Sequence, residues 1–206
     1  MLRGRLITIE GLDGAGKTTL AVGLHEALAA RGREVAVLRE PGGVRAAERV
    51  RELVRDPELE IGPRAEALLY AAARAQLVDE AIDPLLAQGQ WVLLDRFVDS
   101  SLAYQGAGRE LGVESVGAIN DFATTGLRPD RTLLLAIEPR VGRARMQTRA
   151  QSPDRLEREH SEFFARVASA YERLAARDPA RIRRIDAAQP RARVLADALR
   201  AIADLL

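Results

Sequence analysis

Cysteine is absent from this chain of 206 residues, and its absence excludes disulfide bonds, thiolate nucleophiles and cysteine-bound metals. No apolar run reaches the roughly 20 residues that span a membrane, and no signal-peptide pattern precedes the first strand-like segment. The net charge is only +1, so bulk electrostatics give no reason to expect a nucleic acid or membrane partner. Together these absences favour a cytoplasmic enzyme.

Histidine and lysine are also scarce. The two histidines, His25 and His160, lie outside every motif and are expected on helix surfaces. The sequence therefore shows no Ser-His-Asp set and no histidine cluster for a metal. Lys17 is the only lysine, and arginine supplies every other basic side chain.

Length and pattern predict one α/β domain that spans residues 1–206, since 47% of the residues are hydrophobic and no linker divides the chain. Strands are predicted at Arg5–Glu10, Glu34–Leu38, Trp91–Asp95, Arg131–Ile137 and Arg181–Ile185. Helices are predicted at Lys17–Ala30, Arg45–Arg55, Pro63–Ala87, Glu114–Thr124, Val141–Arg149, Arg158–Ala176 and Arg191–Leu205. Alternation of this kind is typical of a parallel sheet covered by helices.

The segment GLDGAGKTTL, which begins at Gly11, matches the Walker A pattern of a phosphate-binding loop, with a strand before it and a helix after it. Backbone N–H groups at the start of such a helix cradle phosphate. Lys17 is expected to reach the β- and γ-phosphates of ATP, and Thr18 to bind Mg²⁺. The predicted ATP-binding residues are Gly11, Leu12, Asp13, Gly14, Ala15, Gly16, Lys17 and Thr18.

The loop pattern allows two alternatives to an ATP-dependent enzyme. The first is a glycine-rich turn that matches the pattern by chance, which the strand–loop–helix context disfavours. The second is a nucleotide switch without enzymatic activity. The guanine-reading motif of switch GTPases and the signature motif of partitioning ATPases each need a further lysine, and Lys17 is the only one.

Three further segments give the loop a more specific context: REPGG (39–43), LLYAAARAQ (68–76) and DRFVDSSLAYQG (95–106). With the loop they resemble the thymidylate kinase family, from the first strand to the helix after DRLE (154–157). The resemblance implies a five-stranded parallel sheet of nucleoside-monophosphate-kinase type and a homodimer. It also implies transfer of the γ-phosphoryl group of Mg-ATP to dTMP, which gives dTDP and ADP in dTTP synthesis. A kinase of the same fold that acts on another nucleoside or nucleotide is the alternative.

The resemblance also assigns roles to single residues. Asp95 would lie by Mg²⁺ and the phosphates, and Arg96 and Arg51 would bind the monophosphate of dTMP. Tyr70, where the family usually has phenylalanine, would stack on thymine, and Arg74 would hydrogen-bond the base. The set implied to bind dTMP is Arg51, Tyr70, Arg74, Arg96, Ser100, Ser101, Tyr104 and Gln105. The set implied to act in catalysis is Lys17, Asp13, Asp95, Arg96, Arg149 and Arg155.

Within these sets, the residue at position 101 would read the pyrimidine edge, and Tyr104 would crowd the 2′ position of the sugar. Asp13 would lie near the 3′-hydroxyl. The alternatives are structural: Ser100 or Ser101 could be a helix N-cap, Tyr104 a partly buried surface residue and Asp13 a stabiliser of the loop. Arg51 could be a solvated helix residue, and Tyr70 could pack in the core beside an exposed Arg74.

A polar segment, QTRAQSPDRLE (147–157), is predicted to be a lid. One branch of the family carries a catalytic arginine in its phosphate loop, whereas the other has glycine there and uses a lid arginine. This chain has Gly14, so it resembles the second branch, and Arg149 or Arg155 would assist transfer. The alternative is that both arginines balance the carbonyl dipoles of helix ends.

Overall fold

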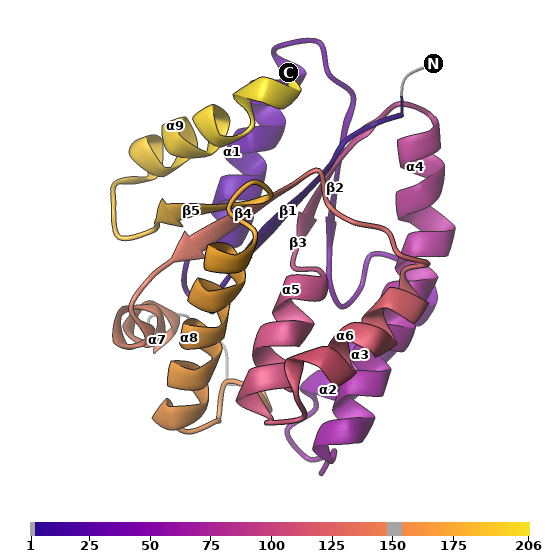
Figure 1. Ribbon diagram of the computed structural model, residues 1–206, viewed down its shortest axis with the longest axis vertical. Coiled ribbons are helices and arrows are strands. Elements are labelled where there is room, and N and C mark those ends of the chain that lie inside the picture. Colours follow the sequence, from indigo (N-terminus) through magenta and orange to yellow (C-terminus); the bar gives the residue numbers. More distant parts are fainter. Residues whose placement is uncertain (1–2, 148–153) are drawn as a thin grey trace.

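The computed structural model describes residues 3–147 and 154–206, which form a sheet between two layers of helices (Figure 1). The strands are β1 (Leu6–Gly11), β2 (Val35–Arg39), β3 (Trp91–Asp95), β4 (Arg131–Ala136) and β5 (Ile182–Asp186). Their order in the sheet is β2-β3-β1-β4-β5, and every neighbouring pair is parallel. The predicted α/β class with a five-stranded parallel sheet is therefore confirmed.

Strand β1 lies at the centre of the sheet and is buried on both faces. Leu6 contributes to the core on one face, and Ile7 and Ile9 contribute to the core on the other. Ile7 pairs with Leu93 of β3 on one side and with Arg131 of β4 on the other. Burial on both faces is expected for a central strand of a parallel sheet that helices cover on both sides.

Two sets of helices cover the two faces of this sheet. Helices α1 (Lys17–Ala29) and α9 (Arg191–Ala201) pack on one face through Leu24 and Ala198. The other face is covered by two groups of helices, which pack through Leu77 and Val167 among others. These helices are α3 (Pro63–Leu77), α4 (Asp83–Ala87), α5 (Val98–Ser101) and α8 (Ser161–Arg177). The remaining α-helices among the described residues are α2 (Arg45–Arg55), α6 (Val113–Ala123) and α7 (Pro139–Gln147).

The structure differs from the sequence prediction in two helical regions. The predicted helix 63–87 contains a π-helical turn, η1 (Val78–Ile82), between α3 and α4. No helix was predicted at 98–108, where α5 continues into a second π-helical segment, η2 (Leu102–Gly108). Two glycines and two serines weaken helix propensity there, whereas burial against α8 stabilises it. A short 3₁₀ turn, η3 (Ala203–Leu205), ends the chain.

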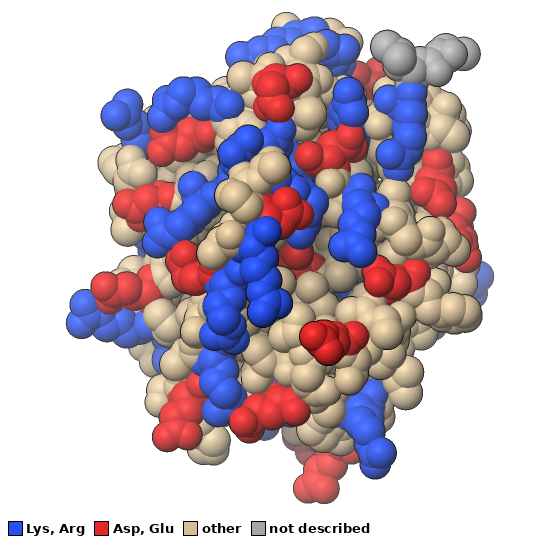
Figure 2. All heavy atoms as spheres, viewed as in Figure 1, with Lys and Arg blue, Asp and Glu red and all other residues tan. Residues whose placement is uncertain are grey.

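Parallel strands bring their carboxyl ends to one edge of the sheet, so the segments that follow β1, β2 and β3 meet there. Figure 2 shows basic and acidic side chains interspersed over the visible face, in keeping with the small net charge. In the described part of the chain, no helix has both the length and the apolar character required to cross a membrane.

Candidate active site

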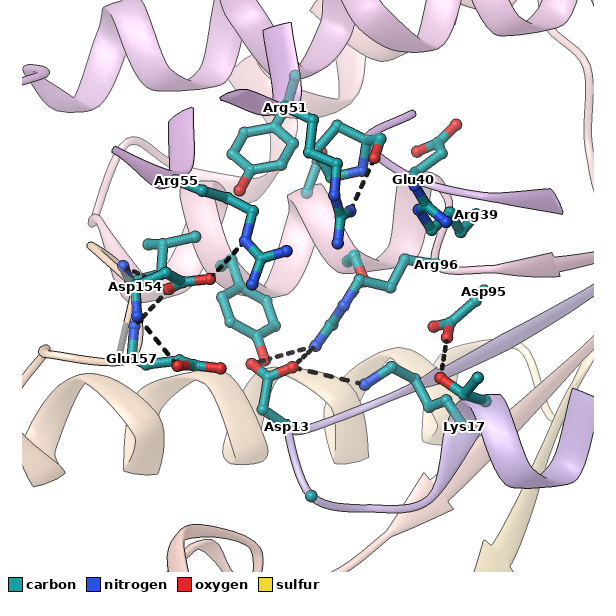
Figure 3. A pocket seen from close by; sticks show the side chains of 18 of the residues that line it. Asp13, Lys17, Arg39, Glu40, Arg51, Arg55, Asp95, Arg96, Asp154 and Glu157 are labelled. Atoms are coloured by element: carbon teal, nitrogen blue, oxygen red, sulfur yellow. Dashed lines mark hydrogen bonds and ion pairs between the residues drawn. The ribbon is translucent and has the colours of Figure 1, made fainter. Parts of the chain in front are cut away.

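The candidate site is a cavity of about 250 Å³ at this carboxyl edge (Figure 3). Residues from the phosphate loop, from the segment after β2, from α2 and α3, and from the turn after β3 line it together. All eight residues that were predicted to bind dTMP contribute to its wall. Segments that lie far apart in the sequence therefore meet around one cavity, which is large enough for part of a nucleotide.

The phosphate loop forms one end of the cavity. Asp13, Gly14, Gly16, Lys17 and Thr18 line it, whereas the other three predicted residues of the loop are buried beneath. Gly16 has a φ of 97°, a left-handed conformation that glycine adopts without strain. The loop thus turns directly into α1, whose first N–H groups point toward the space that phosphates would occupy.

Lys17 is held at the centre of this end. Its ammonium donates to the carbonyl oxygens of Gly11 (3.2 Å) and Leu12 (3.1 Å), and lies 3.8 Å from the Asp13 carboxylate. Burial lowers the pKa of Lys17 from its ordinary value, and the charge of Arg96 acts in the same direction. An anion bound here would therefore meet a cation that is already poorly solvated and already positioned.

Thr18 and Asp95 lie together where the loop meets β3. The threonine hydroxyl donates to the Asp95 carboxylate at 3.1 Å. No cluster of three or more acidic or histidine side chains suited to a metal occurs among the residues that the structure describes. One hydroxyl and one carboxylate nevertheless fit Mg²⁺, which usually takes one or two protein ligands and completes its shell with water and substrate phosphates.

Arg96 follows β3 and turns back toward the phosphate loop. Its φ of 72° is unusual for a residue with a side chain, and such backbone strain is often found at functional sites. The guanidinium donates to Asp13 (2.6 Å) and to the Gly11 carbonyl (3.1 Å), and it lies over the Tyr104 ring. Although burial opposes ionisation of Asp13, the charges of Arg96 and Lys17 hold the pKa of its carboxyl below the usual range.

Glu10, which the sequence analysis did not select, supports the turn that carries Arg96. It lies at the end of β1 and is fully buried. Its carboxylate accepts hydrogen bonds from the backbone N–H of Phe97 (2.7 Å) and from the hydroxyls of Ser100 (2.5 Å) and Tyr171 (2.9 Å). Burial, with the charge of Asp99, raises the pKa of Glu10 from 4.5 to about 7. A carboxyl at the end of the apolar strand LITIE was the available sequence signal.

The alternative that Ser100 or Ser101 is an N-cap is wrong. Both serines lie inside α5, which begins at Val98 and has no side-chain cap. The Glu10 carboxylate, supplied by β1, instead accepts from the first N–H groups of this helix. Ser100 shares that carboxylate, and Ser101 faces the cavity.

Arg74 lies at the other end of the cavity in a buried polar network. It is 1% exposed and forms an ion pair with Glu40, to which its Nε donates at 2.8 Å. Its remaining donors reach Ser101 (2.8 Å), the Phe97 carbonyl (2.9 Å) and Asn120. All five N–H groups of the guanidinium thus have acceptors, so the alternative of an exposed Arg74 is wrong. A hydrogen bond to a base would need one of these contacts to be released.

The two predicted pocket tyrosines occupy different surroundings. Tyr70 is half-buried on the cavity wall, one helical turn before Arg74. Burial, followed by the charge of Glu66, raises the pKa of Tyr70, so the phenol stays neutral. Tyr104 is 5% exposed and packs edge-on against Phe163, with its hydroxyl 3.3 Å from Asp13. The alternative of a surface position for Tyr104 is therefore wrong, whereas the roles in stacking and sugar selection stay predictions.

One of the two predicted lid arginines, Arg155, is not among the side chains that line the cavity. Arg149 lies outside the described residues. Arg155 instead donates to the Val54 carbonyl (3.0 Å) and to the Glu66 carboxylate (2.6 Å). Asp154, which does line the cavity, pairs with Arg55 of α2 at 2.9 Å.

Several residues of the wall were missed by the sequence analysis. Arg55 lies one helical turn after Arg51, a spacing that could have indicated it. Others belong to motifs that were quoted without assigning them a role. Beside Arg55, the missed residues are Thr19, Arg39, Glu40, Pro41, Asp154, Leu156 and Glu157. Arg51 itself is half-buried in the cavity, 2.8 Å from the Pro41 carbonyl, and is not a solvated helix residue.

Gly14 brings the phosphate loop into close contact with α7. Its φ is +79°, and a Cβ added there would lie 2.3 Å from the carbonyl oxygen of Gly142. Gly142 is equally restricted, since a Cβ there would lie 2.7 Å from the Asp13 carbonyl oxygen. In the same helix, Arg145 donates to the Ala187 carbonyl at 3.1 Å. The helix that leads into the predicted lid is thus anchored against the phosphate loop.

Comparison with known proteins agrees with this geometry. The family model described as "Thymidylate kinase" matches residues 9–198. A thymidylate kinase from Oenococcus oeni is 49% identical over 209 residues, which cover 100% of this chain and 98% of the relative. One from Alkalilimnicola ehrlichii is 48% identical, with 95% and 90% covered, and one from Pelotomaculum thermopropionicum is 47% identical, with 100% and 95% covered.

Proposed function

The chain belongs to the thymidylate kinase family and is a dTMP kinase, and we propose how its cavity divides the work between ATP and dTMP. The phosphate loop holds the β- and γ-phosphates of ATP, with Lys17 as the central cation. The opposite wall holds dTMP, with Arg96 and Arg51 at its phosphate and Tyr70 beside its base. The convergence of all eight predicted dTMP-binding residues on one cavity is the observation that carries this assignment.

The acceptor explains why the reaction needs no general base. A phosphate monoester has a second pKa of about 6, so it is mostly a dianion at neutral pH and is already a nucleophile. The difficulty is to bring two polyanions together and to balance charge on the transferred group. Besides the neutralised Arg74, the cavity is lined by the cationic side chains of Lys17, Arg39, Arg51, Arg55 and Arg96, which Figure 3 labels.

Thr18 and Asp95 would hold Mg²⁺. A bound Mg²⁺ neutralises charge on the phosphates and orients them for in-line transfer. The chain's own residues supply the rest: the loop N–H groups and Lys17 fix the donor, while Arg96, anchored by Asp13 and Glu10, fixes the acceptor.

A lid arginine would complete the charge balance. Arg155 is held by Glu66 and Val54 outside the cavity, so its participation requires release of that ion pair. Arg149 remains the other candidate. Lid closure would also exclude water and limit futile hydrolysis of ATP.

We also propose a homodimer. Three neighbouring helices, α2, α3 and α6, expose Leu53 (46%), Leu68 (56%) and Phe122 (89%). Exposed large apolar side chains gathered on neighbouring helices are typical of a contact surface. Light scattering of the purified protein and of Phe122→Glu tests the dimer; a monomeric unmodified protein would refute it.

The function is tested by a substrate panel of dTMP, dUMP, dCMP, dGMP, UMP and thymidine, each with Mg-ATP. We expect the highest kcat/KM for dTMP and no activity without Mg²⁺. Preference for another monophosphate would change the assignment of the acceptor but not the assignment of the ATP-binding residues. Activity on thymidine alone would reject the monophosphate assignment of Arg96 and Arg51.

A further inference from the structure

Glu66, in the first turn of α3, is a fully buried carboxylate next to the substrate cavity. It accepts hydrogen bonds from three side chains of other segments: Gln105 Nε2 at 2.9 Å, Arg109 at 3.0 Å and Arg155 at 2.6 Å. A carboxylate paired with two guanidinium groups accepts hydrogen bonds and has none to donate. Whatever faces Glu66 must therefore present a donor.

This requirement fixes the side-chain amide of Gln105. The oxygen and nitrogen of an amide have nearly the same shape, so the hydrogen-bond partner decides which way the group points. With Nε2 directed at Glu66, Oε1 is the end left for the cavity that Gln105 lines. Among the described residues, no donor reaches this oxygen. Gln105 thus offers the substrate an acceptor.

Ser101, one helical turn earlier on the same wall, offers the complementary group. Its hydroxyl oxygen accepts from Arg74 at 2.8 Å, which leaves the hydroxyl hydrogen free to donate. Ser101 contacts Arg74 and Gln105 contacts Glu66, whereas Lys17 and Arg96 pair with Asp13 at the phosphate loop. Ser101 and Gln105 therefore belong to the part of the cavity left for a base. An acceptor beside a donor matches the N3–H and O4 of thymine or uracil. Cytosine presents the reverse pattern, with an acceptor at N3 and an amino group at C4.

We propose that Glu66 is a positioning residue that fixes the Gln105 amide and thereby makes the cavity select imide bases over cytosine. This inference rests on the proposed function, because it takes the base of a pyrimidine monophosphate as the group that meets Gln105. Glu66 acts without touching the substrate, through the one hydrogen bond that it accepts from Gln105.

The test compares dUMP with dCMP, two substrates of nearly equal size that both lack the methyl group of thymine. We expect the unmodified protein to favour dUMP in kcat/KM by about 10²-fold or more, since a buried acceptor facing another acceptor is strongly rejected. In Glu66→Gln the new amide can donate to Gln105 Oε1 and let the Gln105 amide turn over. The dUMP:dCMP ratio should then fall by about tenfold or more.

The matched control is Arg109→Met, which removes another partner of Glu66 but keeps the Glu66–Gln105 contact. Its dUMP:dCMP ratio should equal that of the unmodified protein. A purely structural role of Glu66 predicts instead that Glu66→Gln lowers both kcat/KM values alike and leaves the ratio unchanged, which would overturn the proposal. An unmodified protein that does not discriminate would overturn it too.

Two further measurements separate the possible failures. If Glu66→Gln does not fold, ¹⁵N–¹H spectra of the unmodified protein decide, with the Gln105 amide identified by its loss in Gln105→Met. Slow exchange of that amide with solvent, both without substrate and with dTMP, supports the contact to Glu66, and fast exchange contradicts it. If the unmodified protein phosphorylates dTMP but the ratio fails to move in Glu66→Gln, only this inference fails. Absence of dTMP phosphorylation rejects the proposed function itself.

Discussion

Arg96 and Arg74 line the same cavity, and each pairs with an acid, but they differ in what surrounds them. The Arg96 side chain is 16% exposed and its partner Asp13 is 33% exposed, whereas the corresponding values for Arg74 and Glu40 are 1% and 3%. Arg96 lies beside Lys17 and the phosphate loop, where an anionic ligand would arrive. Arg74 already uses all its donors on Glu40 and other neighbours.

The difference shows that arginine serves two purposes within one site. At the phosphate end, its charge is only partly balanced and remains available to a ligand. At the proposed base end, the charge of Arg74 is neutralised inside the protein, and Ser101 and Gln105 give the wall neutral hydrogen-bonding groups. A site built this way can attract phosphate at one end without forcing a charge against an uncharged base at the other.

The largest effect should come from Lys17. In Lys17→Met we expect kcat/KM for dTMP to fall by about 10³-fold or more, because removing a positioned cation leaves transition-state charge unbalanced. Stability should change little, since among the described residues the ammonium donates to two carbonyl groups and makes one long contact with Asp13, which keeps Arg96 as a partner. ADP release measures the first quantity, and urea unfolding the second. Activity within tenfold of the unmodified protein would contradict the assignment.

Lys17 also allows a chemical test, because the chain has just two amines, Lys17 and the α-amino group of Met1. The α-amino group, with an ordinary pKa near 8, should be acylated first at mild pH, without loss of activity. Acylation of Lys17 should abolish activity, since it removes the charge. Mg-ATP should protect Lys17, whereas dTMP alone should protect it little. Mass spectrometry of labelled peptides gives the answer, and full labelling with activity retained would refute this reading.

The contrast between Arg74 and Arg96 can be tested by replacing each of them with methionine. Arg74→Met should lower the free energy of unfolding by about 3 kcal/mol or more, because it leaves Glu40 buried without a counter-charge. Arg96→Met should cost less, since Asp13 is one-third exposed and keeps Lys17 nearby, but it should raise the KM for dTMP far more. Urea unfolding and steady-state kinetics of both variants provide the comparison. Equal losses of stability in the two variants would show that the Arg74–Glu40 and Arg96–Asp13 ion pairs contribute equally to stability, which would contradict this prediction.

The role of Glu10 in supporting the turn that carries Arg96 can be tested by measuring how the free energy of unfolding depends on pH. The folded protein holds a proton on Glu10 up to about pH 7, whereas the unfolded chain releases it near pH 4.5. The free energy of unfolding should therefore fall as pH rises through this range, by about 3 kcal/mol. Glu10→Gln carries no such proton, so its stability relative to the unmodified protein should rise from pH 4.5 to pH 8. A stability difference independent of pH would contradict the prediction.

The smallest effect concerns the sugar. If Tyr104 crowds the 2′ position, dTMP should be preferred over its ribose counterpart, and Tyr104→Ala should narrow that preference by about tenfold. Tyr104→Phe is the matched control, because it keeps the ring and removes only the hydroxyl near Asp13. The preference should persist in this control. Equal use of both sugars by the unmodified protein would reject the role.

Much of the site could be read from the sequence because its groups lie in short motifs with fixed local geometry. The phosphate loop needs only a strand, a glycine-rich turn and a helix in succession, so the placement of Lys17 and Thr18 follows from local rules. The turn after β3 likewise carries Arg96 next to the strand end. Where the conformation of a segment depends only on residues close in the sequence, a motif is sufficient to predict where its side chains lie.

Other features depended on contacts between distant segments. Glu10 caps α5 across 87 residues, and Glu66 meets Gln105 across 39, so no local pattern indicates either contact. The helix at 98–108 has weak local propensity and is stabilised by packing against α8. Whether Arg74 faces a ligand or the protein was decided by Glu40, which directly follows β2, and by Asn120 of α6. The sequence by itself determined the fold class, the phosphate loop and those residues of the cavity wall that lie in motifs. Only the tertiary structure decided which further residues join that wall and which charges are neutralised, because both depend on distance in space and on burial.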